Sequence, residues 1–184
     1  MTPMFGIIAS QITGRLSTNS YESIATVTVG AGGSSTITFS SIPSTYKHLQ
    51  IRGLTFAATN PNSGVKTQFN SDTGSNYAQH ALYGGGTTAN AYGFASQTFI
   101  EGGYTGDANY GGAFVLDILD YSNTNKYKTT RSLTGNDANA TGTRYIAFLS
   151  GLWMNTAAIS TITITHSVGI NFAQYSSFAL YGIK

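Results

Sequence analysis

The chain has 184 residues, of which 41% are hydrophobic, so it can bury a substantial core and is not an intrinsically disordered chain. Only 9% of the residues are charged, the formal net charge is +2 and the basic residues are spread out, which excludes the concentrated basic face that nucleic-acid binding requires. The absence of cysteine excludes disulfides, thiolate metal sites and a cysteine nucleophile.

Residues 1–20 are expected to form an extended N-terminal arm, separate from a body at 21–184. Pro3 and Gly6 discourage a long helix in the arm, and a polar hinge at 17–20 precedes the body. Its apolar stretch is too short for a membrane span or for the core of a signal peptide. The arm carries five large apolar side chains that predict docking on a partner: Phe5, Ile7, Ile8, Ile12 and Leu16.

The first part of the body predicts strands around a glycine-rich turn. Polar and apolar side chains alternate over 22–29 and 36–40, which is the period of a strand with one exposed and one buried face. The turn at 30–35 predicts that these two strands form a hairpin. A third strand is expected at 48–56, with a β-bulge at Gly53.

The middle of the body alternates short strands with segments rich in glycine. Strands are expected at 65–69, 77–83 and 94–101, where apolar and β-branched or aromatic residues recur. The segments 84–93 and 102–112 are rich in Gly, Thr, Ala and Asn, which predicts long exposed loops.

The last part of the body completes the predicted fold. The run 113–119 is apolar at nearly every position, which predicts a strand that is buried on both faces or is a covered edge strand. Residues 126–133 alternate, and further strands are expected at 144–153, 159–166 and 178–183. Short strands at this spacing predict an all-β fold, a jelly-roll-like antiparallel β-sandwich.

No metal-binding pattern emerges from the histidines or the acidic loop. His48, His80 and His166 lie on separate predicted strands, without the spacing of a zinc site. The segment 70–76 places oxygen-bearing side chains around Gly74, as calcium loops do, but lacks the carboxylates and closing glutamate of an EF-hand. An Asx turn is the favoured interpretation of this segment, and bound calcium stays an open alternative.

The acidic residues also argue against catalysis. Asp117 and Asp120 are three residues apart on a strand, so their side chains point to opposite faces, whereas paired-carboxylate chemistry needs both in one cleft. Asp117 lies in an apolar run and should pair with Arg131 or Arg144. We therefore expect no enzyme, no catalytic residue, no cofactor and no metal.

Twelve tyrosines offer rings that could stack on a sugar. Those in strands, such as Tyr77, Tyr145 and Tyr181, are expected to be core residues. Four lie in or beside the glycine-rich segments, where binding residues often sit on a rigid scaffold. These four are candidate glycan contacts: Tyr83, Tyr92, Tyr104 and Tyr110.

Several segments of the body resemble a known family. The stretches 21–29, 41–52 and 174–183, together with 69–77 and 117–121, resemble small virion structural proteins of tailed bacteriophages, notably marine and cyanobacterial ones. The resemblance covers the chain from about residue 21 onwards. It implies a virion location and a role either in capsid decoration or in a tail fibre, and it implies no enzymatic activity.

The first interpretation is thus a non-enzymatic capsid decoration or cement protein, docked on the virion through its N-terminal arm. Its partners would be other capsid or tail proteins and further copies of itself, with a trimer as one arrangement. The alternative is a tail-fibre or adsorption module that binds host surface glycan through the tyrosine-bearing segments. Neither interpretation involves nucleic acid or a membrane.

Overall fold

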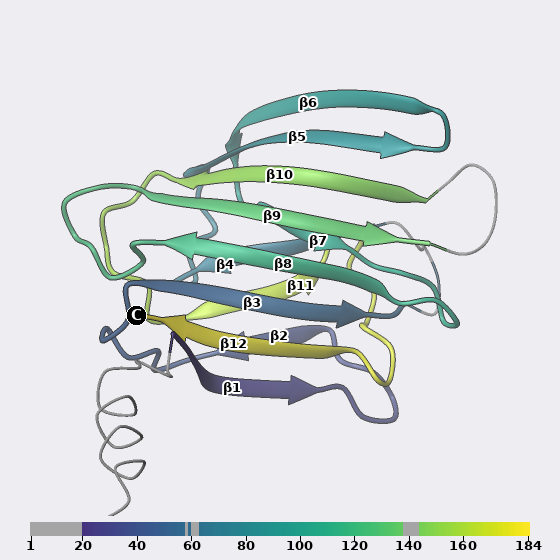
Figure 1. Cartoon of the computed structure of the whole chain (residues 1–184). Coiled ribbons are helices and arrows are strands. Elements are labelled where there is room, and N and C mark those ends of the chain that lie inside the picture. Colours follow the sequence, from purple (N-terminus) through teal and green to yellow (C-terminus); the bar gives the residue numbers. More distant parts are fainter. Residues whose placement is uncertain (1–19, 58, 60–62, 138–143) are drawn as a thin grey trace, which may run out of the picture.

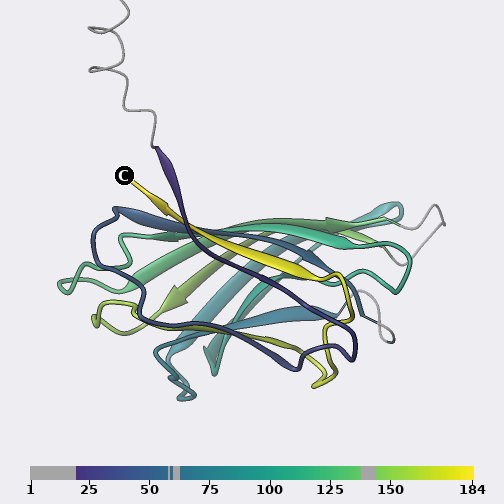
Figure 2. The ribbon, with the colours of Figure 1, turned by 90° about the horizontal axis from the view of Figure 1, so that it is seen from below.

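The computed structural model describes residues 20–57, 59, 63–137 and 144–184, and within these residues the fold is all-β, without a helix. Two antiparallel sheets pack face to face as a β-sandwich (Figures 1 and 2). The large sheet has the order β1 (Tyr21–Thr28), β12 (Ser177–Ile183), β3 (His48–Thr55), β8 (Gly112–Leu119), β9 (Lys128–Asn136), β10 (Tyr145–Trp153), β5 (Tyr77–Gly85) and β6 (Thr88–Gln97). The small sheet has the order β2 (Thr36–Phe39), β11 (Ile162–His166), β4 (Gly64–Phe69) and β7 (Ile100–Tyr104).

Eight of the strands have jelly-roll connectivity, as the sequence predicted. Strands β1-β12-β3-β8 face β2-β11-β4-β7, and the chain passes from one sheet to the other as it runs through these eight strands. The predicted hairpin of the first two strands is therefore wrong, because β1 pairs with β12 while β2 pairs with β11. Their connection is longer than the two-residue turn that enforces a hairpin, so the chain can cross between the sheets.

The other four strands extend the large sheet beyond the jelly roll. Strands β9 and β10 follow β8, and the hairpin of β5 and β6 completes this side of the sheet, with β6 as its edge (Figure 1). The predicted loop at 84–93 is thus mostly the β5–β6 hairpin, and the predicted strand at 94–101 joins the end of β6 to the start of β7. The sequence did not predict this pairing, because the glycine and alanine residues of these strands resemble those of a loop.

The core lies between the two sheets and is rich in aromatic residues. Trp153, Tyr77 and Phe69 are fully buried, with the ring centroids of Phe69 and Trp153 5.6 Å apart. The predicted bulge at Gly53 is absent, since β3 pairs with β8 and β12 without a shift in register. The Phe114 ring occupies the space where a Cβ at Gly53 would lie, so this glycine provides room for an aromatic ring.

The inner face of β9 carries a row of polar side chains that hold β7 in place. Ser132 Oγ lies 2.6 Å from the carbonyl oxygen of Gly102, and the Tyr104 amide donates to Thr134 Oγ1 at 2.9 Å. These side chains are buried, but each is paired with a backbone group of the facing strand, so their burial carries little desolvation cost.

Lys128 begins the same row and is fully buried. Its Nζ donates to the carbonyl oxygens of Asn123 at 2.6 Å, Lys126 at 2.9 Å and Thr156 at 3.0 Å. Burial lowers the pKa of Lys128. One ammonium thus fastens the turn before β9 to the loop after β10.

Replacing Lys128 with Met should lower the free energy of unfolding by about 3 kcal/mol, because three carbonyl groups would lose their donor inside the fold. Urea denaturation of the Lys128→Met variant measures this loss. The matched control is Lys126→Met, which removes an exposed ion pair with Asp120 and should cost less than about 1 kcal/mol. Equal losses for both variants would contradict the structural role given to Lys128.

Candidate interaction surface

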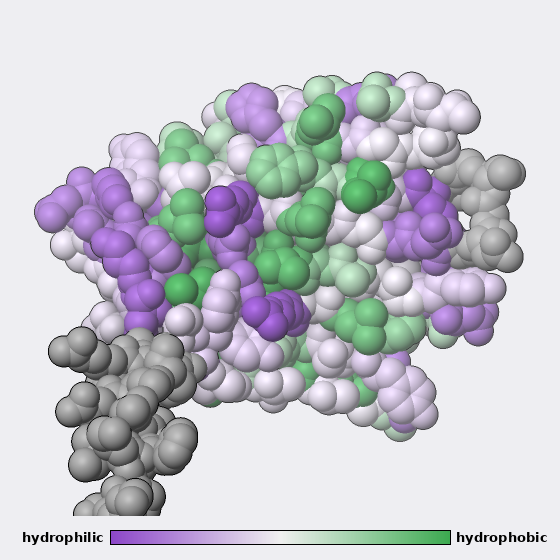
Figure 3. All heavy atoms as spheres, viewed as in Figure 1, coloured by the Kyte–Doolittle hydropathy of each residue, from purple (hydrophilic) through white to green (hydrophobic). Residues whose placement is uncertain are grey.

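The outer face of the large sheet exposes an unusual number of large apolar side chains. Four of them are between 52% and 64% exposed although none lies on an edge strand: Leu82, Leu133, Ile146 and Phe148. Figure 3 shows hydrophobic side chains gathered on this face of the molecule. Exposed apolar area of this kind usually marks an interaction site.

The pairing register arranges this face into two parallel rows that cross the strands. Residues opposite one another on β8, β9, β10 and β5 form a row of large side chains, which we call the ridge: Val115, Leu133, Phe148 and Leu82. The next outward row on the same strands is mostly small, and we call it the trough: Ala113, Gly135, Ile146 and Gly84. The two rows lie two residues apart on every strand.

The trough belongs to a groove of about 1310 Å³ at one end of the sheet. The β5–β6 turn, Asn136, Asp137 and Arg144 border it. Arg144 Nη2 lies 3.1 Å from Asp107 Oδ2, and the Tyr145 amide donates to Asn136 Oδ1 at 3.0 Å. The groove thus combines an apolar floor with a polar end.

A polar network borders the ridge on its other side. Asp117 accepts hydrogen bonds from Arg131 Nε at 2.9 Å and from Gln50 Nε2 at 2.7 Å. Arg131 is one of the two predicted partners of Asp117, which is confirmed, while Arg144 pairs with Asp107 instead. Arg52 donates to Gln50 and lies over the Tyr181 ring, 4.8 Å from its centroid. The charges beside the ridge therefore have fixed partners.

Three of the four candidate glycan tyrosines are not in loops. Tyr83, Tyr92 and Tyr104 lie on β5, β6 and β7 and gather with Tyr145 on the inner face of the sheet extension. Ring centroids are 5.8 Å apart for Tyr83 and Tyr92 and 5.7 Å apart for Tyr104 and Tyr145. These rings pack against one another as a second small core. Tyr110 alone lies in a loop, where it is exposed.

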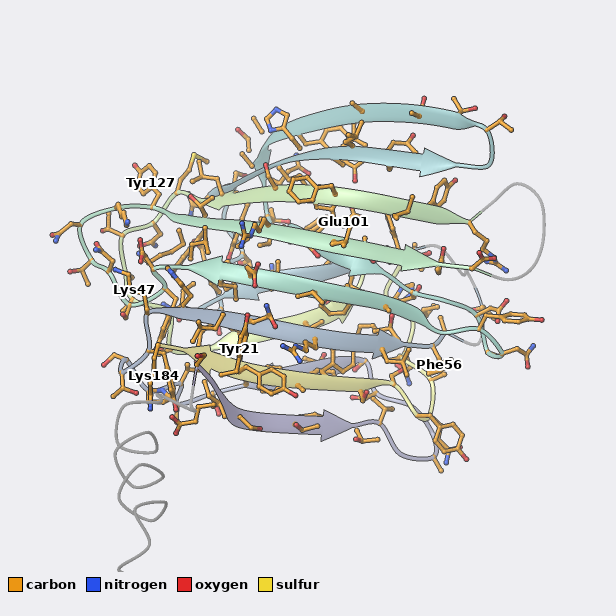
Figure 4. The ribbon with its side chains drawn as sticks, in the orientation of Figure 1. Tyr21, Lys47, Phe56, Glu101, Tyr127 and Lys184 are labelled. Atoms are coloured by element: carbon orange, nitrogen blue, oxygen red, sulfur yellow. The ribbon has the colours of Figure 1, made fainter. Side chains whose placement is uncertain are left out.

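Glu101, labelled in Figure 4, lies beneath this tyrosine cluster on β7. The Tyr92 hydroxyl donates to Glu101 Oε2, and the Glu101 amide donates to Gln79 Oε1 at 2.8 Å. Burial raises the pKa of Glu101, and the hydrogen bond from Tyr92 offsets part of that rise. Burial and the neighbouring Glu101 also raise the pKa of Tyr92. The hydrogen bond between Tyr92 and Glu101 therefore joins β6 to β7.

The three histidines lie on separate strands, and the acidic segment 70–76 forms a turn. His48, His80 and His166 lie on β3, β5 and β11, as predicted, and the described part of the chain holds no group of three or more His, Cys, Asp or Glu that could bind a metal ion. Asp72 accepts hydrogen bonds from the Gly74 amide at 2.9 Å and from Trp153 Nε1 at 2.8 Å. The segment is therefore an Asx turn tied to the core.

The predicted docking residues of the arm, Phe5, Ile7, Ile8, Ile12 and Leu16, lie outside the described residues. Within the described ranges, none of the structure is a helix of the length and hydropathy that crossing a membrane requires.

Sequence reasoning missed the ridge. It predicted that 113–119 is a strand buried on both faces or a covered edge strand, whereas β8 lies inside the sheet and its residues Ala113 and Val115 point outwards and are exposed. The available signal was large apolar residues at alternate positions of several strands, but only the register shows that they form one row.

Comparisons with known proteins add no functional assignment. No protein-family model matches the chain, and no curated protein matches it. Among solved structures, the crystal structure of the galectin LEC-6 from Caenorhabditis elegans is 10% identical, covering 89% of this chain and 98% of the galectin, with a TM-score of 0.24. A similarity this low supports no inference about function.

Replacing Glu101 with Gln should stabilise the protein at high pH. Because the folded pKa of Glu101 is raised above its ordinary value of 4.5, the folded state loses stability as the pH rises through the folded pKa. The side-chain amide of the Glu101→Gln variant carries no charge, and its oxygen would still accept the hydrogen bond from the Tyr92 hydroxyl. Thermal unfolding should give equal midpoints for the two proteins at pH 4 and a higher midpoint for Glu101→Gln at pH 8.

The matched control is Glu22→Gln on β1, where the hydrogen bond and charge of Lys184 lower the pKa of an exposed carboxylate. This variant should not gain stability at pH 8. A gain for Glu22→Gln, or none for Glu101→Gln, would contradict the effect ascribed to burial.

Proposed function

We propose that this chain is a non-enzymatic structural protein of a phage virion and that it acts as a capsid decoration protein. The resemblance of residues 21–184 to small virion proteins of tailed phages gives the class. The observation that carries the proposal is the exposed outer face of the large sheet, because a ridge of large apolar side chains is suited to being covered by a protein surface. The sandwich supplies a stiff support for such a face.

Low surface charge supports the same role. Nine basic and seven acidic residues leave a net charge of +2, so copies would repel one another only weakly at close range. The acidic and basic groups beside the ridge already pair within the chain, as Asp117 does with Arg131. Covering the ridge would thus bury few unpaired charges.

The arm at 1–20 is proposed as the attachment to the particle. Removing residues 1–16 should release the protein from virions, because Phe5, Ile7 and Ile8 would no longer contact the particle. The body should stay folded, since β1 begins at Tyr21 and completes the sheet beside β12. Co-sedimentation with particles that lack the protein measures binding, and a thermal melt measures folding.

The control for this deletion is a full-length chain in which all five large apolar residues of the arm are replaced by Ser: Phe5, Ile7, Ile8, Ile12 and Leu16. It should lose particle binding as the deletion does. If either variant sedimented with particles as fully as the wild type, the arm would not be the attachment.

The second candidate function is adsorption to host surface glycan. The groove favours it, since a polar end with Asn136, Asp137 and Arg144 beside an apolar floor is the composition of a sugar site. Tyr110 precedes Gly111 at the border of this groove and is the one exposed loop tyrosine of the four candidates.

If the groove binds glycan, Tyr110→Ala should weaken binding to a positive glycan at least about tenfold, because the ring would no longer stack on the sugar. The matched control is Tyr127→Ala, an equally exposed tyrosine at the opposite end of the sheet (Figure 4). A glycan array without any binding, or equal binding by both variants, would remove this candidate.

A further inference from the structure

On β8, β9 and β5 a large residue of the outer face lies next to a small one, in a way that one copy alone does not use, whereas on β10 both positions are large, Ile146 and Phe148. On β9, Leu133 of the ridge is followed two residues later by Gly135 of the trough. On β5, Leu82 is followed by Gly84, and on β8, Ala113 precedes Val115. Each of these three strands thus carries a large side chain, the knob, two residues away from a small one, the hole.

The chain does not fill its own holes. A Cβ added at Gly84 would have no neighbour closer than 3.8 Å, and one added at Gly135 none closer than 3.4 Å. Buried glycines differ, since a Cβ at Gly53 would lie 2.0 Å from the Phe114 ring. The space above Gly84 and Gly135 is therefore open for a side chain from outside.

We propose that the outer faces of two copies of this chain pack together around a two-fold axis. The axis would lie in the interface, parallel to the ridge and the trough and midway between them. Rotation by 180° about this axis places the ridge of each copy over the trough of the other, and it brings each strand onto its own counterpart. Leu133 then faces Gly135 of the second copy, Leu82 faces Gly84 and Val115 faces Ala113, which is the self-complementarity that a two-fold interface requires. On β10, Phe148 faces Ile146, so two apolar side chains of similar exposure meet there.

The same rotation brings opposite charges together at the rim. Arg131 lies one outward position beyond Leu133 on β9, and Asp137 lies two residues beyond Gly135, directly after the end of β9. The arrangement therefore places Arg131 of each copy beside Asp137 of the other. The side chain of Arg131 is 61% exposed while it binds Asp117, so it can reach a second carboxylate.

The area is adequate for a stable pair. The face spans the strands from β3 to β6, about 4.8 Å apart, with outward rows about 7 Å apart, which gives on the order of 700 Å². A standard interface buries roughly 800 Å² on each partner. Aligned packing of two sheets, about 10 Å apart, accommodates their twist.

This pairing goes beyond the proposed virion role, since it names the occupant of the outer face and holds for the isolated protein. The test is the mass of the full chain in solution by analytical ultracentrifugation. The wild type should have twice the mass of 19.4 kDa. Gly135→Leu should raise the dissociation constant at least about tenfold, because it fills the hole that Leu133 of the other copy enters.

A second variant reverses this defect. Under the two-fold axis, exchanging knob and hole on β9 restores the fit, so Leu133→Ala combined with Gly135→Leu should dimerise within about threefold of the wild type. Gly30→Leu, at a glycine with no atom within 4 Å of an added Cβ and outside the face, is the control and should leave the mass unchanged. Thermal melts confirm that each variant is folded.

Three outcomes would overturn the pairing: a wild-type monomer or trimer, a dimer that Gly135→Leu does not weaken, or a double variant that stays as weak as Gly135→Leu. The last result would indicate that two copies meet through this face in another relative orientation, in which Leu133 does not face Gly135. Because particle binding is measured separately with the arm deletion, failure of the pairing and failure of the virion role give different results.

Discussion

The pairing register of β8, β9, β10 and β5 determines most of what this molecule presents to its surroundings. These ladders run without a shift, so every second residue of each strand enters the core and the others align into rows on the outer face. A slip of one residue would exchange the two sets. Leu133 would then point into the core, and the polar side chains of β9 that bind β7 would point outwards. The polar inner row and the apolar outer row are therefore two results of a single constraint.

The sequence predicted the fold class and most strands because alternation is a local property. It could not predict the connection from β1 to β2 across the sheets, since the partners of these strands, β12 and β11, are more than a hundred residues away. It also missed β6, where Ala, Gly and Asn replace the usual strand residues and nearly every side chain is exposed. Such a strand forms because β5 offers it an edge, which is tertiary information.

The candidate interaction surface also has features that the sequence could predict and features that it could not. The need of Asp117 for a basic partner and the Asx turn at Asp72 could be predicted from the sequence, because an acid in an apolar run and an oxygen-rich turn are local patterns. The tyrosine cluster and the ridge were not, because each draws one residue from each of several strands. Glycine was the most misleading residue. Gly84 and Gly135 resemble loop residues, but they lie in strands and form part of the trough on the outer face.

The burial of Lys128 has a practical consequence. Its amine is enclosed by three backbone carbonyls, whereas Lys47, Lys126 and Lys184 extend into solvent. An amine-directed reagent that modifies these exposed lysines leaves Lys128 untouched as long as the sandwich is closed. Modification of this single position would then record, chemically and permanently, each opening of the two sheets.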